Sequence, residues 1–219
     1  MKVGVIDSGV YAAHPHVNGV AGGIGITSDG HEQSDYTDRL GHGTAVTAVI
    51  REKAPEAEIF AVKIFPDSLA TRIEPLIAAI DWCVRNRMDL INLSLGTSNP
   101  AHEPLLLEAV NRVRAQGGQV VAAGENAGTR WLPGSLPGAR AVELDWNCPR
   151  DEYRTVARAD GTVVYRASGF PRPAPGIPVA QNLKGLSFAV ANVTGLLARE
   201  YCCIRSDHGD AFKPATGSA

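Results

Sequence analysis

Asp7, His42 and Ser187 are three residues whose types, taken together, could perform nucleophilic chemistry. A serine hydroxyl is a weak nucleophile until a neighbouring imidazole accepts its proton, and a carboxylate can orient that imidazole and stabilise its charged form. Each of the three stands beside a glycine-containing turn at the expected end of a structural element. The sequence therefore predicts an Asp–His–Ser hydrolase, provided that the fold brings the three side chains together.

Each of these residues also has a simpler explanation when it is taken alone. Asp7 could cap a turn with Ser8-Gly9, His42 could be an exposed capping residue, and Ser187 could be an ordinary helix N-cap. Taken singly, the simpler explanation is favoured for Asp7 and for Ser187, and only the three motifs together favour the chemical interpretation. Two local features nevertheless suit that chemistry. The glycines on both sides of His42 leave its imidazole accessible, and the helix N-terminus expected at Ser187 would stabilise developing negative charge.

The elements that must position these residues follow from the hydrophobic pattern. Nearly continuous apolar runs, rich in β-branched residues, predict buried strands at 3–6, 58–65, 90–95 and 119–123. Apolar residues at helical spacing predict helices at 72–86, 103–116 and about 188–201. Strands that alternate with helices indicate an α/β fold with a mostly parallel central sheet and helices on both faces. Ligands gather at the carboxyl ends of such strands, which is where Asp7 stands.

The rest of the chain predicts one domain. Residues 147–164 are more polar and indicate a hairpin or exposed loops, and the proline-rich segment 171–178 is a connector that can be neither helix nor central strand. We expect a catalytic domain over residues 1–205 and a flexible C-terminal tail over residues 206–219, where apolar spacing disappears.

Composition excludes several classes of function. The chain is 44% hydrophobic and 20% charged with a net charge of −2, and its basic residues are scattered, so neither nucleic acid nor an anionic membrane is an expected partner. The first predicted strand follows Met1 too closely for a secretory signal, and no apolar run is long enough to span a bilayer. Four cysteines, two of them adjacent, fit a reducing compartment. We therefore expect a cytoplasmic protein.

Several motifs together resemble one known family. They are Val5-Ile6-Asp7-Ser8-Gly9, Gly41-His42-Gly43-Thr44, Gly185-Leu186-Ser187-Phe188-Ala189, Asn92-Leu93-Ser94-Leu95-Gly96, Val121-Ala122-Ala123-Gly124 and Ala174-Pro175-Gly176. Their order along the chain, with Asp before His before Ser, is that of the subtilisins. The chain is identified as similar to the subtilisin-like serine proteases, the subtilase family. A flavodoxin-like nucleotide binder would share the parallel sheet, but Ser8-Gly9-Val10-Tyr11 is not a glycine-rich phosphate loop.

The resemblance implies a subtilisin-like three-layer fold and a serine endopeptidase with Asp7, His42 and Ser187 as its triad. It implies a peptide or protein substrate that lies extended between two strands and contacts Ser94, Leu95, Gly96, Ala122, Ala123 and Gly124. We expect no cofactor and no required metal. The same triad could serve an esterase or an acyl transferase, and a degenerate subtilase could bind peptides without turnover.

One departure from the family pattern affects the expected oxyanion hole, and two others lie near the nucleophile. Relatives have asparagine directly after Ala-Ala-Gly, whereas here Glu125 precedes Asn126. Either Asn126 supplies the amide after a one-residue insertion, or Glu125 takes the place as a protonated donor; Asn-Ala-Gly favours Asn126. Leu186 and Asn192 replace a threonine and a histidine that are common in the family.

The chain begins on the strand that carries Asp7, which resembles a compact subtilase without a pro-domain. We expect it to fold unaided or with a separate helper, and we expect room for a homodimer or partner protein at the shortened N-terminal edge. These features favour a restricted intracellular or peptide-maturation protease.

Overall fold

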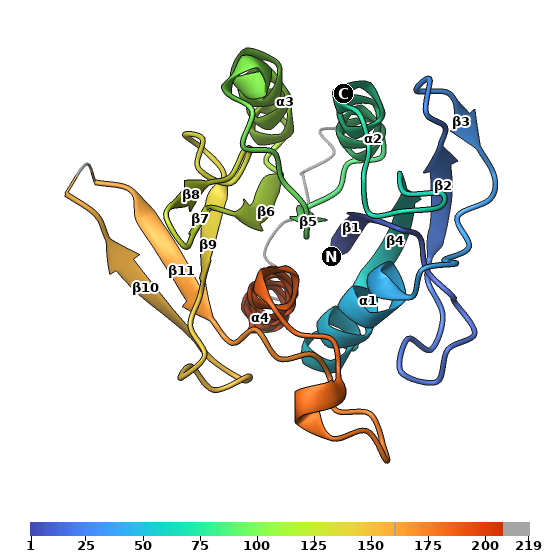
Figure 1. Cartoon of the computed structure of the whole chain (residues 1–219), viewed down its shortest axis with the longest axis vertical. Coiled ribbons are helices and arrows are strands. Elements are labelled where there is room, and N and C mark those ends of the chain that lie inside the picture. Colours follow the sequence, from blue (N-terminus) through green and yellow to red (C-terminus); the bar gives the residue numbers. More distant parts are fainter. Residues whose placement is uncertain (160, 208–219) are drawn as a thin grey trace, which may run out of the picture.

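The computed structural model, which describes residues 1–159 and 161–207, has a central sheet of nine strands (Figure 1). From one edge to the other these are β10 (Tyr153–Ala157), β11 (Val163–Ala167), β9 (Arg140–Leu144), β6 (Gln119–Ala123), β5 (Leu90–Leu93), β1 (Lys2–Asp7), β4 (Glu58–Lys63), β2 (Gly22–Ile26) and β3 (Glu32–Gln33). Neighbours pair in parallel except at the two edges, where β10–β11 and β2–β3 are antiparallel. A separate hairpin pairs β7 (Glu125–Asn126) with β8 (Thr129–Arg130).

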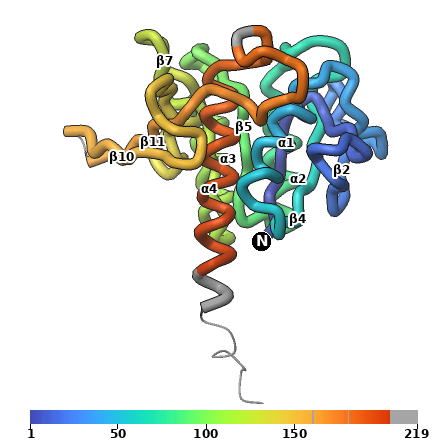
Figure 2. Tube along the Cα trace, turned by 90° about the horizontal axis from the view of Figure 1, so that it is seen from below, coloured from blue at the N-terminus to red at the C-terminus, as the bar shows by residue number. Residues whose placement is uncertain are grey.

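Helices cover both faces of the sheet and give the chain three layers (Figure 1). Helices α1 (His42–Lys53) and α4 (Leu186–Asp207) lie on one face, and α2 (Ile73–Arg85) and α3 (Glu103–Ala115) lie on the other. Short 3-10 turns form at η1 (Pro100–His102) and η2 (Val179–Gln181). Figure 2 shows α4 extending beyond the body of the fold.

Each face of the sheet has its own hydrophobic core. On one face Val3, Val5 and Val121 pack against α1 and α4, and on the other Ile6 and Ile91 pack against α2 and α3. Side chains alternate between the faces of a strand, so a central strand with helices on both sides must be apolar throughout. The continuous apolar runs in the sequence therefore correspond to the strands in the middle of the sheet.

The structure confirms the predicted α/β class and its mostly parallel sheet. The predicted strands correspond to β1, β4, β5 and β6, and the polar segment before residue 164 forms the β10–β11 hairpin. Strand β9 was not predicted, because two charged residues interrupt its sequence Arg-Ala-Val-Glu-Leu and valine is its one β-branched residue. Helix α4 begins at Leu186 rather than at Phe188 and continues past Tyr201.

The predicted domain boundary at residue 205 falls within α4, which continues to Asp207. Residues 208–219 lie outside the described residues, so the C-terminal tail stays a prediction. Within residues 1–159 and 161–207, no helix combines the length and apolar character needed to cross a bilayer.

A buried polar network joins the middle of the sheet to α4. Asn92, which is fully buried on β5, donates to Ser94 Oγ at 2.9 Å and accepts from Thr194 Oγ1 at 2.9 Å. The Thr194 hydroxyl also lies 2.9 Å from the Val190 carbonyl oxygen. A buried amide is costly unless it is hydrogen-bonded, so this network fixes how α4 sits on β5.

Replacement of Thr194 by valine tests this network, because the shape is retained while Asn92 Oδ1 loses its donor. We expect Thr194→Val to lower the free energy of unfolding by about 1–3 kcal/mol, measured by urea denaturation. Thr47→Val is the matched control: Thr47 is equally buried on α1, but its hydroxyl has no hydrogen-bond partner among the described residues. That substitution should be neutral or stabilising, and equal losses in both variants would contradict the assigned role of the network.

Candidate active site

Asp7 and His42 meet where the central strand ends and the first helix begins. His42 Nδ1 lies 2.7 Å from Asp7 Oδ1, and the same oxygen accepts the backbone N–H of Ser8 at 2.7 Å. Only 1% of the Asp7 side chain and 15% of the His42 side chain are exposed. The carboxylate thus holds the imidazole by one ring nitrogen in a largely water-free position.

Two glycines allow the helix to start this close to the strand. Gly41, the residue before α1, has a φ of 83°, a conformation that disfavours side chains. A Cβ added to Gly43 would lie 2.2 Å from the Gly9 carbonyl oxygen, so any larger residue would push His42 away from Asp7. The Gly43 N–H donates to Ser8 Oγ at 2.9 Å. The contact between His42 and Asp7 therefore requires a glycine on each side of His42.

Asp38 organises the same region, and sequence analysis did not single it out. Its Oδ1 accepts from Ser8 Oγ and from the backbone N–H groups of Leu40 and Gly41, each at 2.9 Å. Its Oδ2 accepts from the backbone N–H of Thr44 at 2.9 Å and from the Thr44 hydroxyl at 2.6 Å. Asp38 supplies the partners that the first N–H groups of a helix lack. An acidic residue just before the Gly-His-Gly-Thr motif was the available signal.

The charges around His42 favour its protonated form. Burial lowers the pKa of His42, but the hydrogen bond and the negative charge of Asp7, together with the charge of Asp38, outweigh burial and raise it above 6.5. Burial acts in the opposite direction on the acid Asp38 and raises its pKa. The hydrogen bonds that Asp38 accepts from Thr44, Gly41 and Leu40 outweigh burial, so the pKa of Asp38 is lowered. The site therefore stabilises an imidazolium, the charged species that a general base forms.

Ser187 is the second residue of α4 and lines the same cleft as His42. Its hydroxyl donates to the Ser94 carbonyl oxygen at 3.1 Å, and Ser94 Oγ donates to the Ser187 carbonyl oxygen at 2.9 Å. The ring of Phe188, which follows it, lies 5.8 Å from the His42 ring between centroids. The reciprocal bonds fix Ser187 against the strand end, with its hydroxyl directed to Ser94 and not to His42.

A cleft of about 290 Å³ opens at this point. It is lined by His42, Phe65, Leu69, Ser94, Leu95, Gly96, Ala123, Trp131, Leu186 and Ser187. Four of the six predicted substrate-binding residues are among them. Ala122 is fully buried instead, and Gly124 lines a different cavity.

Trp131, like Phe65 and Leu69, lines the cleft without having been predicted as a site residue. A Cβ added to Gly96 would lie 3.3 Å from Trp131 Cβ, so the indole stands directly against one of the predicted substrate strands. Its Nε1 atom is buried and has no hydrogen-bond partner among the described residues. A lone tryptophan in a polar loop carries no positional signal, because only the fold brings it next to Gly96.

The two candidates for the oxyanion hole lie on the β7–β8 hairpin. Asn126 pairs with Thr129 across the hairpin, and Glu125 forms an ion pair with Arg158 at 3.3 Å with 45% of its side chain exposed. Neither residue lines the cleft. The ion pair is the arrangement of an ionised acid, which differs from the buried neutral donor considered for Glu125. The choice of Asn126 stays a prediction.

The other departures from the motif have clear positions. Leu186 lines the cleft beside Ser187. Asn192 is fully buried and donates to the carbonyl oxygens of Ser168 at 2.9 Å and Phe170 at 3.1 Å, which ties α4 to the segment after β11. Among residues 1–159 and 161–207, no group of three or more His, Cys, Asp or Glu side chains is placed to hold a metal ion.

Comparison with known proteins gives consistent matches. A model of the subtilase family matches residues 1–201. Subtilisin DY of Bacillus licheniformis is 31% identical to this chain, over 90% of the chain and 75% of that protein. The minor extracellular protease Epr of Bacillus subtilis is 39% identical over 58% of the chain, which is 20% of Epr. The chain also spans 52% of subtilisin NAT, so it covers about half or less of several relatives.

Two solved structures share the fold. A lanthipeptide protease superposes with a TM-score of 0.73 at 19% identity, over 98% of this chain and 76% of that one. The prenylagaramide maturation protease PagA superposes with a TM-score of 0.64 at 23% identity, over 95% of this chain and 77% of that one. At this level of identity the likeness is one of fold.

The Asp7–His42 contact can be tested by titrating His42 with NMR. We expect a pKa above 6.5 in the unmodified protein, so that the imidazole loses its proton only as the pH rises through that raised value. Asp7→Asn removes the charge while burial remains, so the pKa should fall and the neutral form should persist to lower pH. An unchanged His42 titration in the variant would contradict the contact.

Proposed function

This chain belongs to the subtilase family, and we propose that it is a serine endopeptidase whose catalytic triad is Asp7, His42 and Ser187. The main support is the 2.7 Å contact between the buried Asp7 carboxylate and His42, in the cleft that Ser187 also lines. The match over residues 1–201 and the 31% identity to subtilisin DY support the same chemistry.

In this mechanism Ser187 Oγ attacks the carbonyl carbon of the scissile peptide bond while His42 Nε2 takes its proton. The Ser187 hydroxyl donates its hydrogen to the Ser94 carbonyl oxygen, so it must first rotate away from this acceptor and toward His42. When the tetrahedral intermediate collapses, the C–N bond breaks and His42 returns the proton to the leaving amine. Water then repeats the sequence on the acyl-enzyme and regenerates the Ser187 hydroxyl. Asp7 remains ionised throughout and stabilises the imidazolium.

The start of α4 supplies part of the stabilisation of the oxyanion. Ser187 is in the first turn of the helix, where backbone N–H groups have no partner within the helix. The helix dipole adds positive potential at the same end. The Ser187 N–H is therefore proposed as one donor to the oxyanion, and a side-chain donor from the β7–β8 hairpin remains the prediction for Asn126.

Labelling with a fluorophosphonate probe tests the triad directly. We expect one adduct on Ser187, located by peptide mass spectrometry and lost in Ser187→Ala and His42→Ala. Peptidase activity should fall by about 10⁶-fold in Ser187→Ala, the loss found when the serine of a subtilisin triad is removed. Ser98→Ala, which changes an exposed serine outside the cleft, serves as a control that should retain the adduct. Absence of an adduct at any pH would favour a degenerate, peptide-binding subtilase, and an adduct with ester but no peptide turnover would favour the esterase or acyl-transferase alternative.

We further propose a restricted substrate range, because Trp131 narrows the cleft. The indole stands against Gly96, and the remaining walls include the apolar side chains of Leu95 and Leu186. A side chain entering between the two predicted strands would meet this indole. A small residue is therefore proposed before the scissile bond. A dedicated maturation protease would need such selectivity, and two proteins of this fold are a lanthipeptide protease and a maturation protease. The intracellular location and a dimer or partner protein stay predictions.

Trp131→Ala tests the proposed selectivity. With a mixed peptide library, the unmodified protein should cleave after Gly, Ala or Ser, and the variant should improve on peptides with Phe or Leu there by about tenfold or more in kcat/KM. Trp131→Phe retains a large aromatic ring at this position and should keep most of the original preference. Trp146→Ala is the matched control, because Trp146 is exposed, packs on Phe170 and does not line the cleft. An unchanged preference in a folded Trp131→Ala protein would contradict this role.

A further inference from the structure

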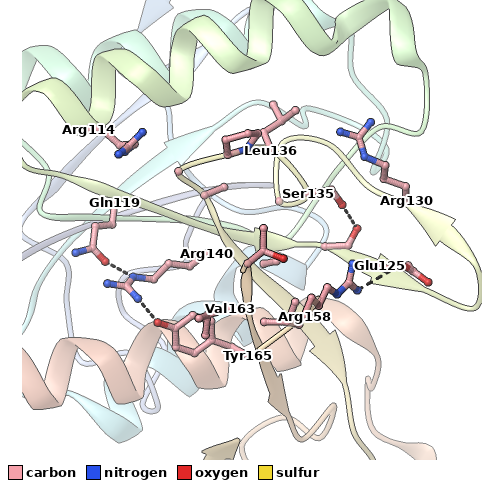
Figure 3. Close-up of a pocket in the computed structure, with 18 of the residues that line it drawn as sticks. Arg114, Gln119, Glu125, Arg130, Ser135, Leu136, Arg140, Arg158, Val163 and Tyr165 are labelled. Carbon is pink, nitrogen blue, oxygen red and sulfur yellow. Dashed lines mark hydrogen bonds and ion pairs between the residues drawn. The ribbon is translucent and has the colours of Figure 1, made fainter. Parts of the chain in front are cut away.

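A second and larger cavity, of about 850 Å³, lies between α3 and the strands β9 and β11 (Figure 3). It is bounded by α3, the β7–β8 hairpin, the loop of residues 134–139 and the turn between β10 and β11. None of the proposed triad residues lines it. No step of the mechanism above uses it.

The lining of this cavity is positive, although the whole chain carries a net charge of −2. Four arginines and two glutamates contribute to it: Arg114, Arg130, Arg140, Arg158, Glu103 and Glu125. Two of the arginines are already paired. Arg130 contacts Glu103 at 2.7 Å, and Arg158 contacts Glu125 at 3.3 Å as well as Glu143.

Of the four arginines that line the cavity, Arg114 and Arg140 have no carboxylate partner among the described residues. Arg114 is exposed near the end of α3, and its guanidinium lies against Gly138, where an added Cβ would come within 2.9 Å of Arg114 Nε. Figure 3 shows it on the α3 side of the cavity, apart from the hydrogen-bonded groups. Its charge is therefore available to a ligand.

Arg140 is held by neutral groups only. It donates to Gln119 Oε1 and to the hydroxyl of Tyr165, whose ring centroid lies 5.4 Å from Arg140 Cζ. The Tyr201 hydroxyl lies 3.5 Å from Nη2. A guanidinium carries five N–H donors, so these contacts fix its orientation and leave donors free. A partly buried arginine that is oriented but not neutralised is suited to receive an anion.

The cavity and the cleft of the proposed active site are lined by residues that are neighbours in the chain. Ala123 lines the cleft and the next residue, Gly124, lines the cavity; likewise Trp131 lines the cleft and Arg130 lines the cavity. The Trp131 N–H donates to the Gly124 carbonyl oxygen at 2.7 Å, so these two pairs form one wall between the two hollows. Arg140 lies beside Tyr201, which follows Ser187 by fourteen residues on α4, so roughly 20 Å separates it from the nucleophile and about six or seven residues of extended peptide would span that distance.

We propose that this cavity binds the carboxylates of an acidic segment of the peptide substrate, with Arg114 and Arg140 as the residues that receive them. The inference rests on the proposed function in that the acidic segment belongs to the peptide cleaved at Ser187. Arginine forks match carboxylates in geometry as well as charge. An acidic segment outside the cleaved residues would add affinity and select substrates without changing the chemical step.

Binding can be measured without turnover in the Ser187→Ala protein, by fluorescence anisotropy of a labelled oligoglutamate peptide. We expect it to bind at least about tenfold more tightly than oligoglutamine at low salt, and the difference to disappear near 0.5 M salt. Arg114→Gln should weaken binding about threefold to fivefold, the effect of one exposed ion pair, and Arg114→Lys should restore most of it. Arg140→Gln should also weaken binding in protein that circular dichroism shows to be folded.

Arg87→Gln is the matched control, because Arg87 is exposed, lies outside the cavity and its loss changes the net charge equally. Equal binding of the two peptides, or equal losses in Arg87→Gln and Arg114→Gln, would overturn the proposal. Tighter binding of a single-stranded oligonucleotide of the same charge would overturn the assignment to a peptide.

The cleavage assay separates this inference from the proposed function. Joining oligoglutamate to a neutral peptide that the enzyme cleaves should lower KM and leave kcat unchanged, and Arg114→Gln should reduce this gain about threefold to fivefold. Cleavage of the neutral peptide without any gain would overturn the acidic-segment site alone. Charge-dependent binding with no cleavage of any peptide would overturn the endopeptidase and leave an anion site.

Discussion

The approach of the first turn of α1 to the end of β1 is the constraint on which the candidate site depends. His42 reaches Asp7 only because Gly43 has no side chain to meet the Gly9 carbonyl, and because Asp38 receives the N–H groups at the start of the helix. The buried contact at 2.7 Å makes the imidazole more basic than burial alone would allow. The electrostatics of the site are thus a consequence of how closely a helix can begin beside a strand.

Ser187 is positioned by a separate set of hydrogen bonds. Ser187 is held by two hydrogen bonds with Ser94, and behind them the buried amide of Asn92 joins β5 to Thr194 on α4. Polar groups in the centre of an apolar sheet are acceptable only when each finds a partner. This network therefore selects one position for α4, and with it one position for the nucleophile. The nucleophile and its base are positioned by separate helices on the same face of the sheet.

The end of β6 lies between the largely apolar cleft and the cavity that is lined by charged residues. On one side lies the largely apolar cleft with Trp131, and on the other lies the cavity with two arginines that lack carboxylate partners. Both depend on the β7–β8 hairpin and the segment after it, where this chain departs from the family motif at Glu125. In the structure Glu125 belongs to the charged cavity through Arg158. The departure thus lies in the wall of the charged cavity and leaves the Asp7–His42 contact as it is.

The sequence by itself determined the alternation of apolar strands and amphipathic helices, and with it the parallel sheet and the strand end that carries Asp7. Local motifs also identified His42 and Ser187, because glycines and a helix start leave short-range signals. Strand β9 was not predicted because its sequence is partly polar, and its place in the sheet depends on pairing with β6 and β11. Tertiary structure alone decided the roles of Asp38, Trp131 and Arg114, since an acid, an indole or a guanidinium acquires a partner, or lacks one, only when distant segments are brought together.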